Sequence, residues 1–522
     1  MTVAIPNPFL PLFLSLFSSY CSAQTATNRL SPIITLNDGS RLYGKETIGT
    51  NGKLVTEYLG IPFAEPPIGN LRFRPPVAKK PWKHIFSATV LPNSCHQTPD
   101  SYFTNFKGAE MWNANTNKSE DCLYLNVWIP GRFEVGRKLA VMVWIFGGGF
   151  WSGTSTLDVY DGKILCSEEN VIVVSMNYRV TLFGFLYLNR PEVPGNMGML
   201  DQLEALKWVR DNIHHFGGLP SEVTIFGESA GAASVSMHVL SPLSQPYFKR
   251  AILQSGSALA PWAMEPPEIL MERALFLSES CGCNVTIRDV RPNIDKLYNC
   301  LMNLEPEILL EKEWVTFEFN DFPWTPVVDH YFLIEEPRIS LLRGNFKRSE
   351  LLVGTNFDES IYFIIYHAAN IFSKDELFTK DEFLTSDALF EQAAKQLLPE
   401  KLKKNPAVQK AIFFEYRDWT LPGNAQRRQQ ALDKMLGDYH FTCSVNEFAE
   451  LYEEKGGAVF YYYFTHRSTQ QTWPAWMGVL HGYEINFIFG EPLNTRDYAY
   501  TQEEKELARR FMRYWANFAR TG

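Results

Sequence analysis

Short apolar runs alternate with longer amphipathic stretches along most of the chain. Seven runs rich in β-branched and aromatic residues are predicted to be strands: Leu123–Trp128, Leu139–Phe146, Val171–Ser175, Val223–Phe226, Arg250–Gln254, Leu351–Gly354 and Val459–Phe464. Five stretches have helical periodicity: Leu200–Asn212, Ala230–Leu240, Pro267–Glu279, Ser386–Leu398 and Glu503–Phe518. Apolar strands that alternate with helices are typical of a parallel sheet buried on both faces. The pattern therefore predicts an α/β fold, with a single doubly wound, mostly parallel sheet and helices on both faces.

The chain is interpreted as one folded unit behind a short leader. Its 522 residues would by length alone suggest three or four domains, but no internal repeat or low-complexity tract divides them. An apolar run from Pro8 to Phe17 ends near the small residues 21–23, which suit a signal peptidase, although no Lys or Arg precedes the run. We expect residues 1–23 to be a signal peptide and residues 24–522 to be one domain.

Charge and cysteine content narrow the functional classes. The net charge of −9 argues against a nucleic-acid partner and mildly favours a cationic ligand. No segment beyond the leader has the apolar length to span a bilayer, so the mature chain is expected to be extracellular and soluble. Of the eight cysteines, Cys21 lies in the leader; the seven that remain leave at least one thiol free or paired with another chain. Sequons predict glycosylation at Asn117 and Asn284.

A turn between a predicted strand and a predicted helix carries a candidate nucleophile. The strand 223–226 runs directly into the G-E-S-A-G sequence of residues 227–231, with Ser229 at its centre and a small-residue helix after it. A serine on such a junction needs glycine on both flanks, because a side chain there would collide with neighbouring backbone. The pattern alone occurs by chance in roughly one or two chains in ten of this length. Its placement favours a catalytic serine over a structural turn serine.

Three glycines upstream suit the other half of an acyl-transfer site. Residues 147–149 follow the predicted strand 139–146, and glycines there would let backbone N–H groups face a developing oxyanion. Alone, the three glycines would be interpreted as a flexible turn. Together with the serine motif about eighty residues later, they indicate an oxyanion hole.

The serine needs a histidine base and a carboxylate that orients it, in the chain order serine, acid, histidine. Six histidines follow Ser229: 238, 330, 367, 440, 466 and 481. His238 is excluded because it lies on the helix of the serine turn and faces elsewhere. The residues do not decide among the other five, although His481 stands at a Leu-His-Gly junction from which a loop could project the ring. The acid is left undetermined.

Three segments resemble signatures of the carboxylesterase/cholinesterase family. They are residues 227–231 (GESAG), 119–126 (SEDCLYLN) and 473–484 (WPAWMGVLHGYE). The similarity extends from about residue 31 to the end of the chain and is greatest with the cholinesterases. It implies an α/β-hydrolase fold and hydrolysis of acetylcholine to choline and acetate through an acyl-enzyme, ending cholinergic signalling, with no cofactor and no metal.

The resemblance supplies the catalytic residues that spacing left open. Ser229 matches the nucleophile, Glu359 within residues 354–360 (GTNFDES) matches the acid, and His481 matches the base. The matching oxyanion donors are Gly148, Gly149 and Ala230. Activity should therefore rise with pH as the imidazole loses its proton, with an apparent pKa near 6 to 7 if it keeps its reference value.

The ligand-binding residues also come from the resemblance. Trp112 matches the choline-binding tryptophan, and an indole face is the best side chain for a quaternary ammonium. The other residues that match the family's choline site are Glu228, Tyr160, Tyr362 and Tyr483. Those that match the mouth of the family's cavity are Asp100, Trp151, Trp314 and Tyr366. Those that match its acyl pocket are Trp262, Asn320, Phe322 and Phe363. Trp151 stands where a tyrosine is usual, and Asn320 where vertebrate-like relatives carry phenylalanine, which predicts a roomier acyl pocket.

Further features follow from the same resemblance. Disulfides are expected between Cys95 and Cys122 and between Cys283 and Cys300. The first would close a loop that contains Trp112, and Cys281 competes with Cys283 as the partner of Cys300. Cys443 matches a cysteine whose partner lies in a carboxyl-terminal segment that this sequence does not contain. That segment is expected to carry the signals for a homodimer or tetramer and for attachment to a membrane or matrix.

Two other functions compete with choline-ester hydrolysis. A general carboxylesterase would share the triad and the oxyanion hole, but it would have no reason to combine Trp112 with Asp100 and Trp314. An adhesion protein of the same fold would typically lack the nucleophile, so Ser229 argues against that class.

Overall fold

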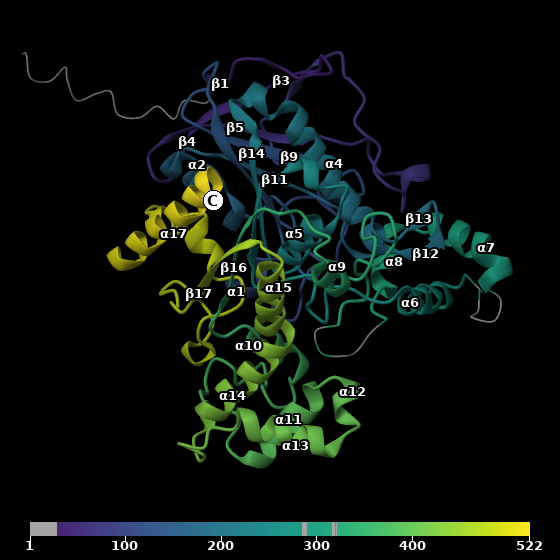
Figure 1. Cartoon of the computed structure of the whole chain (residues 1–522), viewed down its shortest axis with the longest axis vertical. Helices are drawn as coiled ribbons and strands as arrows, with labels where there is room; N and C mark the ends of the chain where they lie inside the picture. Colours follow the sequence, from purple (N-terminus) through teal and green to yellow (C-terminus); the bar gives the residue numbers. More distant parts are fainter. Residues whose placement is uncertain (1–28, 284, 286–289, 316–318, 320) are drawn as a thin grey trace, which may run out of the picture.

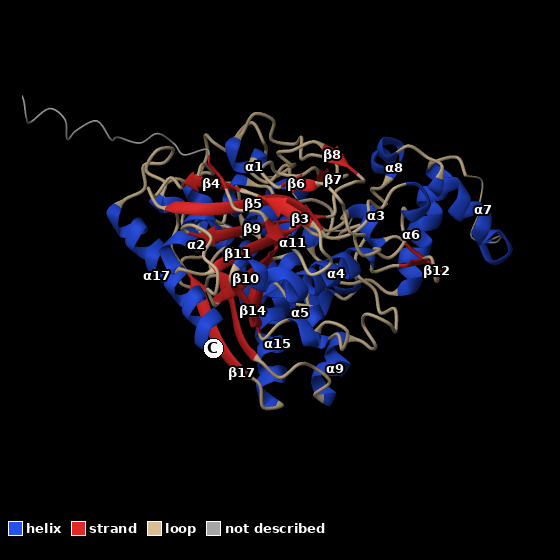
Figure 2. Ribbon diagram, turned by 90° about the horizontal axis from the view of Figure 1, so that it is seen from above, coloured by secondary structure: helices blue, strands red, loops and turns tan. Residues whose placement is uncertain are grey.

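The computed structural model describes residues 29–283, 285, 290–315, 319 and 321–522, so the predicted leader and Asn284 lie outside the described residues. A ten-stranded sheet forms the centre of the molecule (Figure 2). In spatial order its strands are β1 (Arg29–Leu30), β4 (Lys45–Ile48), β5 (Leu54–Pro62), β9 (Tyr124–Pro130), β11 (Ile172–Met176), β10 (Leu139–Ile145), β14 (Gly218–Glu228), β15 (Arg250–Gln254), β16 (Glu350–Asn356) and β17 (Ala458–Phe464).

All seven predicted strands are present in this sheet, and the six from β11 to β17 in spatial order run parallel. The predicted α/β class with a mostly parallel sheet is therefore confirmed. The other four strands pair antiparallel, and three of them, β1, β4 and β5, were not predicted. β4 reads Lys-Glu-Thr-Ile, which lacks the apolar run of a central strand. Three small sheets comprise β2 (Ile34–Thr35), β3 (Arg41–Tyr43) and β6 (Ile85–Ser87); β7 (Ser94–Cys95) and β8 (Lys118–Ser119); and β12 (Tyr187–Arg190) and β13 (Val193–Pro194).

Helices cover both faces of the sheet, as Figure 2 shows. On one face lie α2 (Lys163–Glu169) and α17 (Gln502–Thr521); on the other lie α4 (Met197–Asn212), α5 (Ala230–Leu240) and α15 (Cys443–Glu454). Helix α17 begins with a capping box in which the Thr501 hydroxyl accepts from the Glu504 N–H, and the Glu504 carboxylate accepts from the Thr501 N–H. All five predicted helices are confirmed, with bounds that differ by at most three residues.

The remaining α-helices lie in the segments that connect or follow the strands, or they form a lobe of their own. The first group is α1 (Lys107–Glu110), α3 (Thr181–Phe185), α6 (Pro267–Ser280), α7 (Val290–Met302), α8 (Pro306–Lys312), α9 (Pro337–Arg343), α10 (Ile361–His367) and α16 (Ile485–Ile488). The lobe is α11 (Asp387–Leu397), α12 (Glu400–Lys403), α13 (Pro406–Tyr416) and α14 (Ala425–Gly437), which lie together at the bottom of Figure 1. No helix among the described residues is long and apolar enough to cross a membrane.

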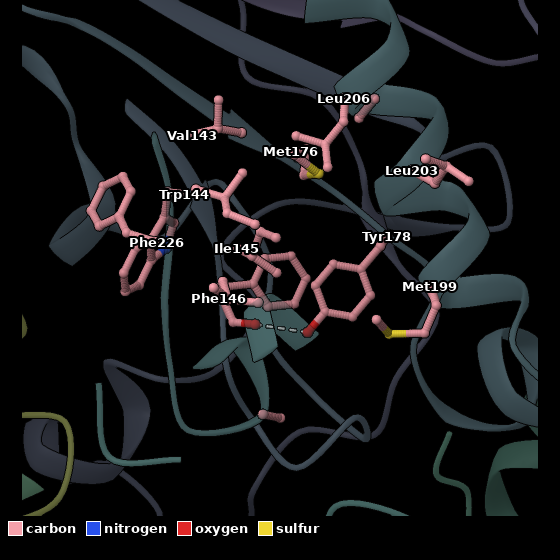
Figure 3. Close-up of a cluster of buried hydrophobic side chains, with 14 of the residues drawn as sticks. Val143, Trp144, Ile145, Phe146, Met176, Tyr178, Met199, Leu203, Leu206 and Phe226 are labelled. Atoms are coloured by element: carbon pink, nitrogen blue, oxygen red, sulfur yellow. Dashed lines mark hydrogen bonds between the residues drawn. The ribbon is translucent and has the colours of Figure 1, made fainter. Parts of the chain in front are cut away.

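Large aromatic side chains fill the core where β10 and β14 end. Trp144 contacts Phe226 with ring centroids 4.9 Å apart, and both rings are fully buried (Figure 3). Beside them the Tyr178 ring stacks on Phe146, and its hydroxyl donates to the Phe146 carbonyl over 2.7 Å. These contacts fix the end of β10, from which the glycines of the predicted oxyanion hole continue.

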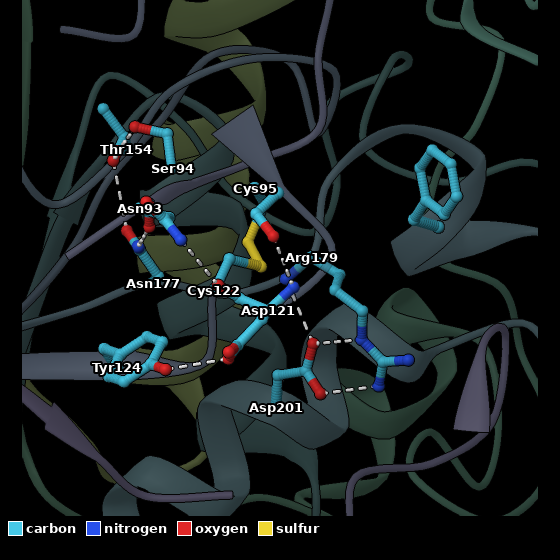
Figure 4. Close-up of a disulfide and its surroundings, with 12 residues drawn as sticks. Asn93, Ser94, Cys95, Asp121, Cys122, Tyr124, Thr154, Asn177, Arg179 and Asp201 are labelled. Carbon is cyan, nitrogen blue, oxygen red and sulfur yellow. Dashed lines mark hydrogen bonds and ion pairs between the residues drawn. A yellow bond between two sulfur atoms is a disulfide. The ribbon is translucent and has the colours of Figure 1, made fainter. Parts of the chain in front are cut away.

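A buried ion pair lies close to the Cys95–Cys122 disulfide (Figure 4). Arg179 donates to both carboxylate oxygens of Asp201 over 2.7 Å, and its backbone N–H donates to the same group over 3.0 Å. Both side chains are almost completely buried. Burial raises the pKa of Asp201 even though the guanidinium opposes the rise. The pair therefore depends on its bidentate geometry to offset the loss of water.

Breaking this pair should destabilise the fold strongly. We expect Asp201→Asn to lower the free energy of unfolding by about 3–5 kcal/mol, because it leaves a buried guanidinium without a counter-charge. Glu376→Gln removes the exposed pair of Glu376 with Lys380 and should cost less than about 1 kcal/mol. Denaturant midpoints measured side by side check the difference; equal midpoints would contradict the argument.

Candidate active site

Ser229 lies on a strained turn between β14 and α5. Its backbone adopts φ 58° and ψ −123°, a conformation that few residues other than glycine adopt. A Cβ at Gly227 or at Gly231 would overlap the carbonyl oxygen of Ile145 at the end of β10. The glycines that the sequence motif required are thus needed to bring the serine turn against the neighbouring strand.

The predicted oxyanion glycines form a turn that faces the serine. Gly148 and Gly149 have φ values of 109° and 62°, which favour glycine, and a Cβ at Gly149 would overlap the ring of Phe322. Ala230 is the first residue of α5, so its N–H has no carbonyl partner within the helix. Backbone N–H groups at these three positions are the arrangement that an oxyanion needs.

The segment that follows β11 holds this glycine turn from behind. The Thr181 N–H donates to the Phe150 carbonyl over 2.8 Å, and the Ser155 N–H donates to the Asn177 side chain over 2.9 Å. Together with the bond from Tyr178 to the Phe146 carbonyl, these contacts anchor both ends of the turn. The donors are therefore positioned before any substrate binds.

His481 and Glu359, which only the resemblance selected, lie in direct contact. His481 Nδ1 is 2.6 Å from Glu359 Oε2, and both side chains are buried. The other oxygen of Glu359 accepts from the Ser255 hydroxyl and from the Asn356 N–H, each over 2.6 Å. The carboxylate thus fixes the imidazole from the side away from the cavity. Of the other candidate histidines, only His367 lines the same cavity, and its Nδ1 faces the Phe363 carbonyl instead of a carboxylate.

Glu228 places a second carboxylate beside the imidazole. Its Oε1 lies 3.0 Å from His481 Nε2, with both groups buried. Burial alone would lower the pKa of His481, but the carboxylates of Glu228 and Glu359 outweigh it and raise that pKa to about 9. Burial raises the pKa of Glu228 to about 8, against the opposing influence of His481. Two buried carboxylates thus stabilise the proton of His481 and raise its pKa above the reference value on which the expected pH profile was based.

A cavity of about 290 Å³ brings most of the predicted site residues together. Fourteen of them line it: Ser229, His481, Gly148, Gly149, Trp112, Glu228, Tyr160, Tyr362, Asp100, Trp151, Trp314, Tyr366, Phe322 and Phe363. Glu359 and Ala230 lie behind this surface, in contact with residues that line it. Asn113 and Leu157 also line the cavity without any motif that indicated them, and so does Gly482, which follows the predicted base.

The base of the cavity pairs an indole with a carboxylate. A Cβ at Gly482 would lie 3.3 Å from the end of the Trp112 ring and 3.5 Å from Glu228 Oε1, so both groups flank this glycine. Any side chain at position 482 would fill the space between them. Tyr483 was expected to line the cavity but does not. Its ring packs edge-on against Trp112 from behind, with centroids 6.3 Å apart.

Aromatic rings also enclose the space beside the oxyanion turn. Phe322 and Phe363 line the cavity, whereas Trp262 does not: it is buried behind Phe322, and its indole donates to the His440 carbonyl. Asn320 lies outside the described residues. No sequence motif indicated Phe441, whose ring centroid is 4.5 Å from that of His481 and which stacks on Phe363. Phe441 belongs to the π-helical turn Asp438–Thr442, a feature that is frequent at functional sites.

A hydrogen-bonded chain of polar groups marks the mouth of the cavity. The Tyr366 hydroxyl donates to Asp100 over 2.6 Å and lies 3.3 Å from the Tyr362 hydroxyl. The Asp100 N–H and carbonyl both bond to the side chain of Asn113, the residue after Trp112. Mouth and base are thus linked through the loop that carries Trp112.

The two expected disulfides are present, and Cys283 is the partner of Cys300. Cys166, Cys281 and Cys443 are free, the last of them exposed. Asn117 is exposed, as a glycosylation site requires. Within the described residues, no cluster of three or more His, Cys, Asp or Glu side chains could hold a metal ion.

Comparison with known proteins agrees with this geometry. The sequence profile of the carboxylesterase family matches residues 30–522. The chain belongs to the carboxylesterase family. Within the family it is 58% identical over 492 residues to acetylcholinesterase 1 of Caenorhabditis briggsae, an alignment that covers 94% of this chain and 79% of the relative. Acetylcholinesterase 1 of Caenorhabditis elegans is 57% identical over the same length and coverage. Acetylcholinesterase of Bungarus fasciatus is 47% identical over 472 residues, 90% of this chain and 75% of the relative.

The carboxylate beside the imidazole predicts a shifted pH profile. A histidine base acts when it is neutral, so activity rises with pH through its apparent pKa. Glu228→Gln removes the carboxyl group 3.0 Å from Nε2, the strongest of the influences that raise the pKa of His481, and should move the acidic limb of the kcat/KM profile to lower pH. Profiles with an uncharged ester isolate this effect from substrate binding. An unmoved limb, or one moved to higher pH, would contradict the assignment.

Proposed function

We propose that this chain is a serine hydrolase that cleaves acetylcholine to choline and acetate. The observation that carries the proposal is the single cavity in which Ser229 and His481 lie beside Trp112 and Glu228. An esterase needs only the first pair. The indole and the carboxylate add a site for a quaternary ammonium, held by cation–π attraction and charge. The acetylcholinesterase names of the relatives support the same substrate.

The proposed reaction divides ester hydrolysis into two steps. Ser229 Oγ attacks the ester carbonyl while His481 takes its proton, and the N–H groups of Gly148, Gly149 and Ala230 stabilise the oxyanion. The imidazolium then protonates the departing choline oxygen, which leaves an acetyl ester on Ser229. A water molecule then attacks the acetyl ester in the same way, with His481 taking its proton, and acetate is released as Ser229 regains its proton. Glu359 orients the imidazole and stabilises its positive charge throughout.

Extracellular action fits the two disulfides, which form and persist in oxidising compartments. Three further expectations stay predictions. They are release at synapses or at the cell surface, a homodimeric or tetrameric state, and attachment through a further carboxyl-terminal segment. A general carboxylesterase is the alternative function, and it would not distinguish charged from uncharged esters.

The function is tested by comparing acetylthiocholine with its uncharged isostere, 3,3-dimethylbutyl thioacetate. Trp112→Ala should reduce kcat/KM for the charged ester roughly tenfold to thirtyfold more than for the isostere, because a desolvated cation–π contact contributes about 2 kcal/mol. Ser229→Ala should reduce turnover of both esters by at least about 10⁴-fold. A wild-type enzyme without preference for the charged ester, or equal losses in Trp112→Ala, would favour the general carboxylesterase.

We further propose that Phe441 limits the size of the acyl group. Its ring backs Phe363 and contacts the ring of His481, so it occupies volume next to the acyl end of the site. Burial leaves the ring only 1% exposed, which gives it little freedom to move aside. The bulk of Phe441 therefore opposes the roomier pocket that the sequence led us to expect.

Phe441→Val should therefore raise the ratio of kcat/KM for butyrylthiocholine to that for acetylthiocholine by about tenfold or more, since each methylene in a pocket discriminates by roughly 1–3 kcal/mol. Phe413→Val in the helical lobe is the matched control for lost aromatic volume and should leave the ratio unchanged. Asn320→Phe should lower the ratio if Asn320 also lines the pocket. An unchanged ratio in Phe441→Val would exclude Phe441 from the pocket.

A further inference from the structure

A buried carboxyl group lies directly behind the mouth of the cavity without any role in the reaction. Glu313 follows α8 and is fully buried, with 0% of its surface exposed. Its Oε1 accepts a hydrogen bond from the indole N–H of Trp151 over 3.0 Å. Its Oε2 is buried with no hydrogen-bond partner, and no cation among the described residues forms an ion pair with it. Such a group is costly to bury, so its single bond is significant.

That bond determines where one wall of the cavity stands. The rings of Trp151 and Trp314 lie 5.1 Å apart with their planes at 56°, and both line the cavity with Asp100. Trp314 is 43% exposed, so this pair of indoles is the part of the wall that an entering ligand meets first. Two tilted electron-rich faces near a carboxylate suit a cation in passage.

The backbone around Trp151 does not need the side-chain bond. The Trp151 and Ser152 N–H groups both donate to the Gly148 carbonyl, over 3.0 and 2.9 Å, and these bonds close the oxyanion turn by themselves. The bond to Glu313 therefore orients the ring and leaves the catalytic turn unchanged. Its loss should affect binding of the ligand more than chemistry.

We propose that Glu313 is a positioning residue for the cavity mouth, holding the Trp151 indole against Trp314 so that the two rings form the entrance for a cationic ester. The inference rests on the proposed function for the choice of ligand. Burial raises the pKa of Glu313 to about 8, so the carboxyl is mostly protonated at neutral pH and an amide can replace it closely.

Three substitutions separate positioning from packing. Glu313→Leu keeps the volume and removes the acceptor. Glu313→Gln, unlike Glu313→Leu, keeps an acceptor at this position. Trp151→Phe keeps a ring but removes the N–H that donates the hydrogen bond. We expect Glu313→Leu and Trp151→Phe each to raise KM for acetylthiocholine about two- to fivefold at pH 7, the range for an exposed cation–π contact, with kcat within twofold of wild type. KM for 3,3-dimethylbutyl thioacetate should change less than twofold, and Glu313→Gln should restore the wild-type KM.

The double variant gives the decisive readout. If Glu313 acts through Trp151, adding Glu313→Leu to Trp151→Phe causes no further loss, whereas independent structural damage would add. Glu311→Leu is the matched control on the exposed end of α8, where Glu311 contacts Lys312 and not Trp151, and it should behave as wild type.

Failure of this inference can be told apart from failure of the proposed function. A wild-type enzyme that turns over the charged ester no better than the isostere would refute the function itself. With that preference intact, unchanged KM in Glu313→Leu, additive losses in the double variant, or no rescue by glutamine would each overturn the role of Glu313. If Glu313→Leu does not fold, Trp151→Phe tests the same hydrogen bond without touching the buried carboxyl, and an unchanged KM there overturns the proposal.

Discussion

The site depends on a close approach of three backbone segments around one carbonyl oxygen. Ile145 ends β10, and the turn that carries Ser229 fits against its carbonyl only because Gly227 and Gly231 lack side chains. That contact holds the serine in a left-handed conformation and brings it beside the glycine turn that continues from β10. Nucleophile and oxyanion donors are thus set by the register of two adjacent parallel strands, which the buried core fixes. The loops contribute only the residues that surround the nucleophile and the oxyanion donors.

The site also concentrates buried negative charge, which a fold tolerates only with compensation. Glu359 is stabilised by three hydrogen-bonding groups including the imidazole, and Glu484 by the amides of Gln254 and Asn356. Glu228 has the least support: its Oε1 makes no hydrogen bond, and only the imidazole of His481, 3.0 Å away, lies beside it as a cationic partner. A quaternary ammonium bound at Trp112 would supply a further positive charge and would lower the pKa of His481 by the same Coulomb argument. Cation binding and activation of the base are therefore favourable to each other.

Sequence reasoning predicted most of what local backbone chemistry dictates. The glycines around Ser229 and the apolar strands predicted the turn, the sheet and the parallel pairing, because these are consequences of sterics and burial over a few residues. At the antiparallel edge, β1 and β4 were missed because they are short and polar, and the apolar run of the longer, buried β5 is interrupted by Thr56 and Glu57. The pairing of His481 with Glu359 needed the family resemblance, since 122 residues separate them. No local sequence pattern indicated Phe441. Its position beside the site follows only from the packing of the π-helical turn against α10, where Phe441 stacks on Phe363.

The same distinction explains where specificity resides. The strands position the proposed nucleophile and oxyanion donors, but the residues proposed to select the ligand come from segments after the strands, as is general for α/β sheets. Trp112 lies in a loop enclosed by the Cys95–Cys122 disulfide, and its neighbour Asn113 fixes Asp100 at the mouth. A change at the mouth can therefore reach the base through the loop while the serine turn stays fixed. Substrate preference can vary independently of catalytic competence because separate structural elements, joined at one cavity, carry the two.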